Sequence, residues 1–368
     1  VIGLTTALRL QQNPNYQVEI IAEYHPTDPK SPHYTSHWAG AHHVSNDPIG
    51  SRKGDADYAT FLEMWKLAAD DGDAPACFLR IPQTEYYIDS TRQEPGILAN
   101  LPSFQHLSQE SLRPGTTSGY SFETITIDVP IYLQYLLNRY LSIGGKINRG
   151  RINHINEVIE SGAAPWRAIN DDLTYPQATA NSDAPDALVV CAGLGARTLG
   201  GVEDSAVYPT RGQTVILRAP WIHFGMSSRP DDKTWVYIIP RQSGDVVIGG
   251  TKGVDDWYPK PRIEARNLLL ENALKLCPEL APPEIREQRS PTIDDLAPLI
   301  VDEGCGFRPS REGGFRLELE RREFELPMKR KLVVPTVYNY GHGAEGYISS
   351  IGCADLVVGL LEQEFASE

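Results

Sequence analysis

The first twenty-three residues constrain the fold more than any other part of the chain. Residues 3–10 begin with small side chains and then carry leucines at the i and i+4 spacing of a helix. Residues 17–22 form a short run rich in β-branched side chains, which Glu23 ends. A helix, a buried strand and an acid about twenty residues after a glycine form the second half of a dinucleotide-binding βαβ unit. We expect Gly3 near a pyrophosphate and Glu23 at a ribose hydroxyl.

The fingerprint of such a unit, G-x-G-x-x-G, is cut short in the printed sequence. Only its third glycine is present, as Gly3, and the preceding strand and first two glycines are missing. In a complete unit the free N–H groups and the dipole at the helix start attract the pyrophosphate. Taken alone, the segment fits an amphipathic surface helix and strand equally well.

The remaining chain alternates between nucleotide-type and β-rich segments. Residues 187–193 form a fully apolar strand that enters a glycine-rich turn, as buried parallel strands do. Residues 213–250 alternate in the β manner, with turns expected at Arg229-Pro230 and Ser243-Gly244. Helices are expected at 58–69, 131–141, 263–276 and about 346–361, and strands near 315–320 and 332–338. The pattern predicts a discontinuous two-domain α/β plan.

Composition excludes several classes of protein. A net charge of -14 and a pI near 5.1 argue against nucleic-acid partners, which bind basic surfaces. No apolar run approaches the length of a membrane span, and mean hydropathy is -0.33, which predicts a soluble protein without a membrane partner. The five cysteines are scattered without zinc-site spacing, so free thiols and no metal are expected.

Four groups of motifs, in order, resemble the D-amino-acid oxidase and D-aspartate oxidase family, in particular its fungal-type D-amino-acid oxidases. They are Tyr34-Thr35-Ser36-His37-Trp38-Ala39-Gly40-Ala41, Pro209-Thr210-Arg211-Gly212-Gln213 with Trp235-Val236-Tyr237-Ile238-Ile239-Pro240-Arg241, Gly306-Phe307-Arg308-Pro309 with Arg311-Glu312-Gly313-Gly314, and Asn339-Tyr340-Gly341-His342-Gly343 with Gly346-Tyr347. The resemblance covers essentially the whole chain.

The resemblance implies a Rossmann-like FAD-binding domain with an inserted β-rich mixed-sheet substrate domain, and FAD held non-covalently. The FAD-binding domain would comprise residues 1–50, 141–205 and 296–368, and the substrate domain residues 51–140 and 206–295.

Two residues are expected to bind the substrate. A guanidinium offers a fork of donors that matches a planar carboxylate, and the resemblance implies this role for Arg308. It also implies that the hydroxyl of Tyr237 shares the same carboxylate. The alternatives are a surface arginine before a proline turn and a strand tyrosine packed in a sheet.

The resemblance also assigns a set of residues to the flavin. A reduced flavin gathers negative charge near its N1–C2=O edge, and a glycine loop that opens a helix presents N–H groups to it. Besides Gly3 and Glu23, the expected cofactor residues are Thr35, Ser36, Trp38, Ala39, Gly40, Ala41, Gly193, Gly343, Ala344, Gly346, Tyr347 and Ile348.

Some positions depart from the pattern of the family. Lys252 follows Gly-Gly-Thr where yeast-type relatives carry a second active-site tyrosine, and it either faces solvent or attracts an acidic side chain. Arg229 lies near the point where aspartate-specific relatives place an arginine, so both residues are candidates for the substrate pocket. His42 and His43 are left unassigned. The segment between Glu320 and Leu332 is too short to carry over the dimer of some yeast relatives, which leaves a homodimer open.

The implied reaction is oxidation of a D-amino acid by O2 and water to a 2-oxo acid, ammonia and hydrogen peroxide, with hydride transfer from Cα to flavin N5. D-Aspartate oxidase is the chief alternative. A flavoprotein without activity, a dehydrogenase with a nicotinamide acceptor and an unrelated NAD-binding protein are the others. An intracellular, peroxisomal location follows from the resemblance alone, since the chain shows no targeting tripeptide.

Overall fold

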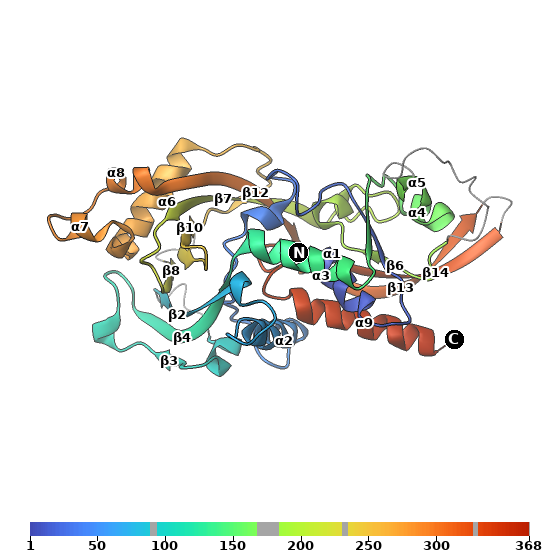
Figure 1. The fold of residues 1–368 in the computed structure, drawn as a ribbon, viewed down its shortest axis with the longest axis horizontal. Helices are drawn as coiled ribbons and strands as arrows, with labels where there is room; N and C mark the ends of the chain where they lie inside the picture. The colour runs from blue at the N-terminus through green and yellow to red at the C-terminus, as the bar shows by residue number, and fades with distance from the viewer. Residues whose placement is uncertain (89–93, 168–183, 230–234, 327–329, 368) are drawn as a thin grey trace.

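The computed structural model describes residues 1–88, 94–167, 184–229, 235–326 and 330–367, and all structural statements concern these residues. The molecule is elongated, with a broad sheet and α6 to α8 at one end and narrower sheets with α1, α4, α5 and α9 at the other (Figure 1). The helices are α1 (Ile2–Gln11), α2 (Arg52–Leu67), α3 (Val129–Ser142), α4 (Ile155–Ser161), α5 (Ala164–Arg167), α6 (Ile263–Leu276), α7 (Pro283–Arg286), α8 (Ile293–Leu296) and α9 (Ser350–Ala366).

The broad sheet contains nine of the described strands and is mixed. Its order is β11-β7-β10-β9-β8-β2-β4-β3, and β12 pairs with β7. The strands are β2 (Phe78–Tyr87), β3 (Gln105–His106), β4 (Ser118–Ile127), β7 (Val207–Arg218), β8 (Gly225–Arg229), β9 (Val236–Pro240), β10 (Asp245–Gly249), β11 (Gly253–Val254) and β12 (Ile300–Arg311). The pair β2–β8 is parallel and the other pairs are antiparallel.

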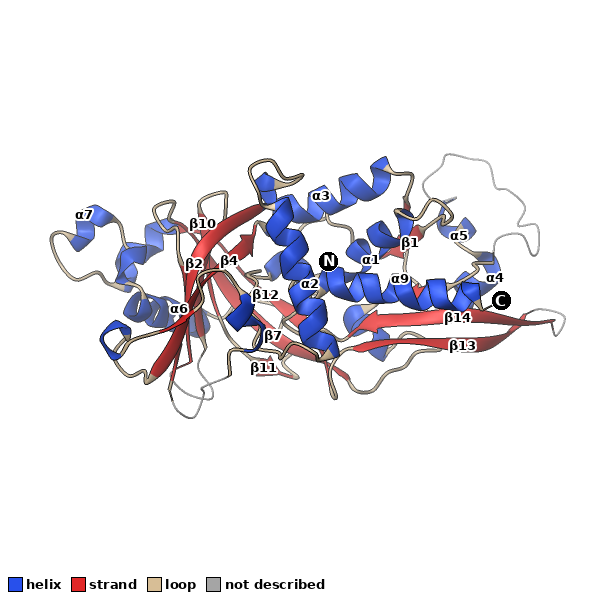
Figure 2. Ribbon diagram, turned by 90° about the horizontal axis from the view of Figure 1, so that it is seen from below, coloured by secondary structure: helices blue, strands red, loops and turns tan. Residues whose placement is uncertain are grey.

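The other half carries two smaller sheets. In one, β1 (Glu19–Ala22) runs parallel to β5 (Lys146–Arg149). In the other, β14 (Arg330–Tyr340) lies between β13 (Arg316–Leu326) and β6 (Leu188–Val190), antiparallel to the first and parallel to the second. Helix α9 lies along β13 and β14 (Figure 2). The predicted fold class, α/β with a β-rich mixed-sheet part, is confirmed.

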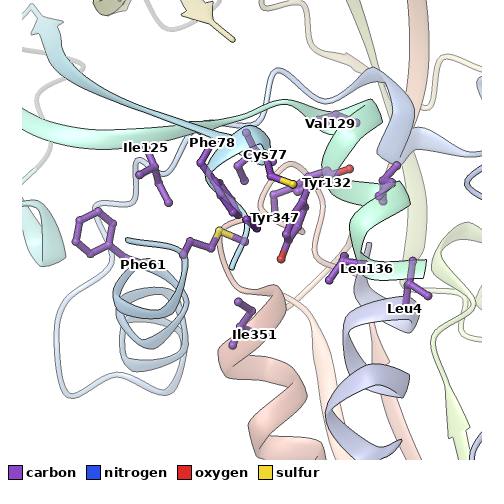
Figure 3. Packing of buried hydrophobic residues seen from close by; sticks show 14 of the residues in the cluster. Leu4, Phe61, Cys77, Phe78, Ile125, Val129, Tyr132, Leu136, Tyr347 and Ile351 are labelled. Carbon is purple, nitrogen blue, oxygen red and sulfur yellow. The ribbon is translucent and has the colours of Figure 1, made fainter. Parts of the chain in front are cut away.

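The main apolar core joins helices from distant parts of the sequence (Figure 3). Leu4 of α1, Phe61 of α2, Phe78 of β2, Tyr132 of α3 and Ile351 of α9 all lie in it and are almost fully buried. Burial of aromatic and aliphatic side chains at this scale is the main stabilising contribution to folding. The core therefore holds the first helix, the last helix and the start of the broad sheet in fixed positions.

Most expected elements are present, with different bounds. The helix expected at 263–276 is confirmed as α6. The last helix was expected from about residue 346 but begins at Ser350, because residues 341–349 form turns in which Gly341 and Gly343 have positive φ. The two late strands are longer than expected, since β13 and β14 pair continuously from Arg316↔Tyr340 to Leu326↔Arg330.

Two further expectations concern β structure. The strand expected to be buried after α1 is only half-buried, since β1 lines a cavity instead of being covered on both faces. The turn at Ser243-Gly244 is present, with Gly244 at positive φ. Of the turn at Arg229-Pro230, Pro230 lies outside the described residues. The expected domain boundaries stay a prediction.

Two findings bear on the classes of protein considered above. Among the described residues, no helix combines the length and apolar character that crossing a bilayer requires. The five cysteines are all free thiols, four of them buried.

Candidate active site

One large cavity, of about 3010 Å³, lies where the broad sheet meets the smaller sheets. It is larger than the few hundred to about 1,000 Å³ of most ligand pockets, which suits a long cofactor together with a substrate. Every residue that the sequence singled out for cofactor or substrate lines it: Gly3, Glu23, Thr35, Ser36, Trp38, Ala39, Gly40, Ala41, Gly193, Arg229, Tyr237, Lys252, Arg308, Gly343, Ala344, Gly346, Tyr347 and Ile348. The fold thus brings together residues from distant parts of the chain, while their individual roles stay predictions.

Arg308 and Tyr237 form the polar centre of this cavity. The Arg308 Nη1 donates to the carbonyl oxygen of Thr251 at 2.9 Å, and the guanidinium lies beside the Tyr237 hydroxyl. Burial raises the pKa of Tyr237, and the adjacent Arg308 charge partly offsets the rise. The phenol therefore stays protonated at neutral pH and can donate to an acceptor. A carboxylate between these two groups would meet donors from both.

Two glycines make room for this pair. A Cβ atom on Gly212 would lie 2.3 Å from Cζ of Arg308, and one on Gly249 would lie 2.0 Å from Cζ of Tyr237. Gly249 is the register partner of Tyr237 across β10 and β9. Both contacts are far too short for any side chain larger than hydrogen. The positions of the two polar groups therefore depend on small residues in neighbouring strands.

A second cationic region lines the same cavity. The Arg229 guanidinium lies 5.2 Å from the ring centroid of Trp235, and the Trp235 and Tyr237 rings meet edge to face. Arg229 is half-buried, whereas Lys252 is exposed. Of the two candidates, only Arg229 lies in surroundings dry enough to strengthen an ion pair.

The loop of residues 34–41 is fastened to the sheet at several points. Thr35 Oγ1 donates to the Phe307 carbonyl oxygen at 2.5 Å, and the buried Arg241 donates to the Ala39 carbonyl oxygen at 2.9 Å. A Cβ atom on Gly40 would lie 2.7 Å from Cδ1 of Ile239, so this glycine lets the loop lie on β9. These contacts fix the loop against the sheet, where it forms a wall of the cavity.

Two members of this loop have additional contacts. Trp38 packs where Gly304 and Gly306 of β12 leave room for its ring. Ser36 accepts a hydrogen bond at its carbonyl oxygen from the Tyr347 hydroxyl at 3.0 Å. The hydrogen bond between Tyr347 and Ser36 joins the loop of residues 34–41 to the loop of residues 341–349.

That C-terminal loop offers backbone donors to the cavity. The N–H of Gly343 is used by the carbonyl oxygen of Pro309, at 2.9 Å. The N–H groups of Ala344, Gly346, Tyr347 and Ile348 have no acceptor among the described residues. Free N–H groups that precede a helix attract negative charge. Ala344, Gly346, Tyr347 and Ile348 therefore fit the anionic edge of a reduced flavin better than Gly343 does.

The N-terminal helix reaches the cavity at its first turn. A Cβ atom on Gly3 would lie 3.2 Å from Cβ of Cys191, so glycine allows α1 to approach the end of β6 closely. Gly193, two residues after Cys191, has a φ of +54°. Glu23 is exposed at the end of β1, and Arg149 donates to its carbonyl oxygen at 3.1 Å. Its carboxylate remains available for a ribose hydroxyl.

Sequence reasoning missed two residues of the cavity. His42, left unassigned, is buried with its ring centroid 6.3 Å from that of Tyr237, and burial lowers its pKa to about 3. Glu85 was not noticed, although it lines the cavity from β2. One signal in the sequence pointed to Glu85. It lies two and four residues after Gln83 and Ile81, so in a strand all three side chains share one face. His43, by contrast, hydrogen-bonds backbone carbonyl oxygens through Nε2 and has a packing role.

The fold and the cavity suit a protein that holds a long dinucleotide cofactor next to a substrate pocket. The model of the family "FAD dependent oxidoreductase" matches residues 1–360. The D-aspartate oxidase of Cryptococcus neoformans var. grubii is 33% identical over 395 residues, covering 98% of this chain and 94% of the relative. The chain belongs to the FAD-dependent oxidoreductase family, in its group of D-amino-acid oxidases and D-aspartate oxidases, and FAD is its cofactor.

Two further similarities agree. The D-amino-acid oxidase of Fusarium vanettenii is 27% identical over 379 residues, covering 99% of this chain and 94% of the relative. Among solved structures, glycine oxidase from Geobacillus kaustophilus has a TM-score of 0.69 at 18% identity, covering 98% of this chain and 92% of that one. The second similarity shows the fold alone. The predictions of family, fold and cofactor are confirmed.

Proposed function

We propose that the protein oxidises D-amino acids with O2, giving a 2-oxo acid, ammonia and hydrogen peroxide. The observation that carries the proposal is the Arg308–Tyr237 pair, in the same cavity as the N–H groups of Ala344 and residues 346–348, which have no acceptor among the described residues. A carboxylate-binding pair beside a flavin site is what oxidation at Cα of an amino acid requires.

The residues of the chain orient the substrate. Arg308 and Tyr237 bind the α-carboxylate, which leaves Cα free to point toward the cofactor. FAD held by the loops of residues 34–41 and 341–349 would supply the hydride acceptor, and O2 would take up the electrons as hydrogen peroxide. The substrate amine reacts in its neutral form, so its lone pair assists departure of the hydride and no strong protein base is needed. The resulting imine is hydrolysed by water.

The reaction also requires a dry cavity. The walls near Tyr237 include the buried Ile239 and His42, and burial keeps that imidazole neutral, since its pKa falls to about 3. Electrostatic attraction between Arg308 and a carboxylate is stronger in such surroundings than in water. A substrate bound in this way cannot pivot easily, and its handedness then decides which atom at Cα faces the flavin.

We further propose that acidic D-amino acids are among the substrates. Arg229 is half-buried in the cavity wall and is a second cation there, besides Arg308. The similarity to the Cryptococcus D-aspartate oxidase supports this choice. Neutral D-amino acids remain substrates in the proposal, because the α-carboxylate site does not depend on Arg229.

A panel assay tests the proposal. Purified protein loaded with FAD is mixed in air with D-alanine, D-proline, D-asparagine, D-aspartate and D-glutamate, and with the L-enantiomers as controls, while peroxide is measured. Peroxide release with D-amino acids alone is expected. Release with the L-enantiomers, or oxidation only with an artificial electron acceptor, would refute the proposal. The peroxisomal location, supported by the resemblance, is tested by microscopy, and the homodimer by sedimentation.

A further inference from the structure

A buried carboxylate lies in the wall of the substrate cavity and has no part in the mechanism above. Glu85 of β2 is 5% exposed and lines the cavity. Its Oε1 accepts from the Gln83 side-chain amide at 2.7 Å, and its Oε2 accepts from the Ser227 hydroxyl. Both donors are neutral. Since burying a carboxylate is costly without compensation, a carboxylate kept in such a place calls for an explanation.

The sheet places Glu85 in one row with Tyr237. Glu85 pairs with Ser227 across β2 and β8, and Ser227 pairs with Tyr237 across β8 and β9. Paired residues on neighbouring strands point to the same face of a sheet. Glu85 therefore shares the face of Tyr237 at a separation of two strand spacings, roughly 10 Å. An amino acid bound by Tyr237 and Arg308 would have this face of the sheet beside it.

Arg229 lies on the same face, two residues after Ser227 in β8. Burial raises the pKa of Glu85 overall, and the hydrogen bonds from Ser227 and Gln83 and the charge of Arg229 offset only part of the rise. Both hydrogen bonds are donated to the carboxyl oxygens, which is the arrangement that suits its ionised form. The field of Glu85 therefore reaches Arg229 and partly cancels its positive potential in the cavity. A second carboxylate of a substrate that approaches Arg229 would therefore also be repelled by the negative charge of Glu85.

The surroundings of Glu85 are adapted to hold it. A Cβ atom on Gly225 would lie 1.8 Å from Oε1 of Gln83, so only glycine at this position leaves room for the amide. Gly225 is the register partner of Gln83. Gln83 itself is fully buried. A glycine, an amide and a hydroxyl thus fix the orientation of one carboxylate at the cavity wall.

We propose that Glu85 is a specificity-determining residue whose negative charge weakens binding of a second substrate carboxylate near Arg229. Glu85 then sets the ratio between acidic and neutral D-amino acids. This inference rests on the proposed function, since it concerns the substrate side chain in the same cavity. For neutral substrates, the charge of Glu85 matters little, because their side chains carry no charge to repel.

The test compares D-aspartate with D-asparagine, which differ by one charge and hardly in size. Glu85→Gln removes the charge and keeps the volume, whereas Glu85→Asp keeps the charge and disturbs the packing. In Glu85→Gln we expect KM for D-aspartate to fall roughly three- to twentyfold relative to KM for D-asparagine. The kcat values should stay close to those of the parent. Glu85→Asp should keep the parent ratio within about twofold.

A binding experiment separates this inference from the proposed function. Succinate and succinamate correspond to the two substrates without the amine, and their affinities for the FAD-loaded protein are measured by calorimetry. In Glu85→Gln we expect the affinity for succinate to rise relative to that for succinamate by the same factor as the KM ratio changes. An unchanged succinate-to-succinamate ratio in Glu85→Gln, or an equal shift in Glu85→Asp, would overturn the inference. If the parent oxidises no D-amino acid but the binding ratio still shifts, the proposed function fails and the role of Glu85 stands.

Discussion

Gly212 and Arg308 are so close that a Cβ atom on residue 212 would lie 2.3 Å from the guanidinium carbon. The glycine lies on β7 and the arginine on the adjacent strand β12. The atoms that would clash belong to the far end of a flexible side chain and not to backbone. A larger residue at 212 would therefore move the guanidinium without breaking the sheet.

The first prediction follows from this contact. Gly212→Ala should lower kcat/KM on the best D-amino acid by about 10²-fold, because a displacement of about 1 Å at a positioning group has that effect. The thermal midpoint should change by no more than a few degrees. Gly359→Ala in α9, where a Cβ would meet no atom within 4 Å, is the matched control and should keep full activity. Equal activity in both variants would show that Arg308 does not bind the substrate where it lies.

The second prediction concerns Arg308 itself. Arg308→Leu should cost roughly 3–5 kcal/mol in kcat/KM, because a desolvated carboxylate loses its charged partner. Both kcat and KM should be affected, since an untethered substrate no longer holds Cα over the flavin. Arg308→Lys should recover only part of the loss, because an ammonium lacks the planar fork. FAD content, measured by absorbance, should survive both changes. Near-parent kcat/KM in Arg308→Leu would rule out the proposed function.

The third prediction concerns the hydroxyl partner. Tyr237→Phe should cost on the order of 1 kcal/mol, since the substrate carboxylate keeps Arg308 as its other partner. The ring remains, so its contacts with Gly249 and Trp235 should persist. Steady-state kinetics with one neutral D-amino acid are sufficient. A loss as large as that of Arg308→Leu would mean that the hydroxyl does more than share the carboxylate.

The fourth prediction separates the two cationic candidates of the pocket. Arg229→Ala should lower the ratio of kcat/KM for D-aspartate over D-alanine by roughly ten- to a hundredfold, about 1.5–3 kcal/mol for a partly desolvated pair. Lys252→Ala should change the same ratio by about 0–1 kcal/mol, because this side chain is exposed. If neither variant moves the ratio, specificity for acidic substrates lies elsewhere in the cavity.

The fifth prediction concerns acid stability. Burial lowers the pKa of His42 to about 3, of His43 to about 4 and of His342 to about 3. Between about pH 4 and 6.5 the unfolded chain therefore binds more protons than the folded chain at these sites, so stability falls as the pH falls. Asp57 acts in the opposite direction, because burial raises its pKa to about 6.

The net linkage from these four groups is up to about two protons, or about 2.7 kcal/mol per pH unit at its steepest. Urea unfolding of the FAD-loaded protein at pH 5 and pH 7 measures it. The midpoint should be lower at pH 5. An unchanged or higher midpoint at pH 5 would show that the buried histidines do not titrate in this way.

Many residues of the candidate active site were predictable because they belong to short sequence motifs. Glycines before a helix, a strand that ends in an acid, and an arginine before a proline are visible as local patterns, and all of them line the cavity. Glu85 escaped notice because an acid in a strand is usually exposed. Its importance arises from Ser227 and Arg229, which come about 140 residues later in the chain.

The sequence by itself determined the family, the fold class, the cofactor and many of the residues that line the cavity, because these follow from hydrophobic periodicity and from motifs. Only the tertiary structure decided which of those residues meet. Strand register places Arg308 beside Tyr237 and sets Glu85, Ser227 and Tyr237 in one row. The tertiary structure also leaves Lys252 exposed and Arg229 half-buried. Register is set by the packing of the whole sheet, which brings distant segments together, and no local pattern in the sequence records it.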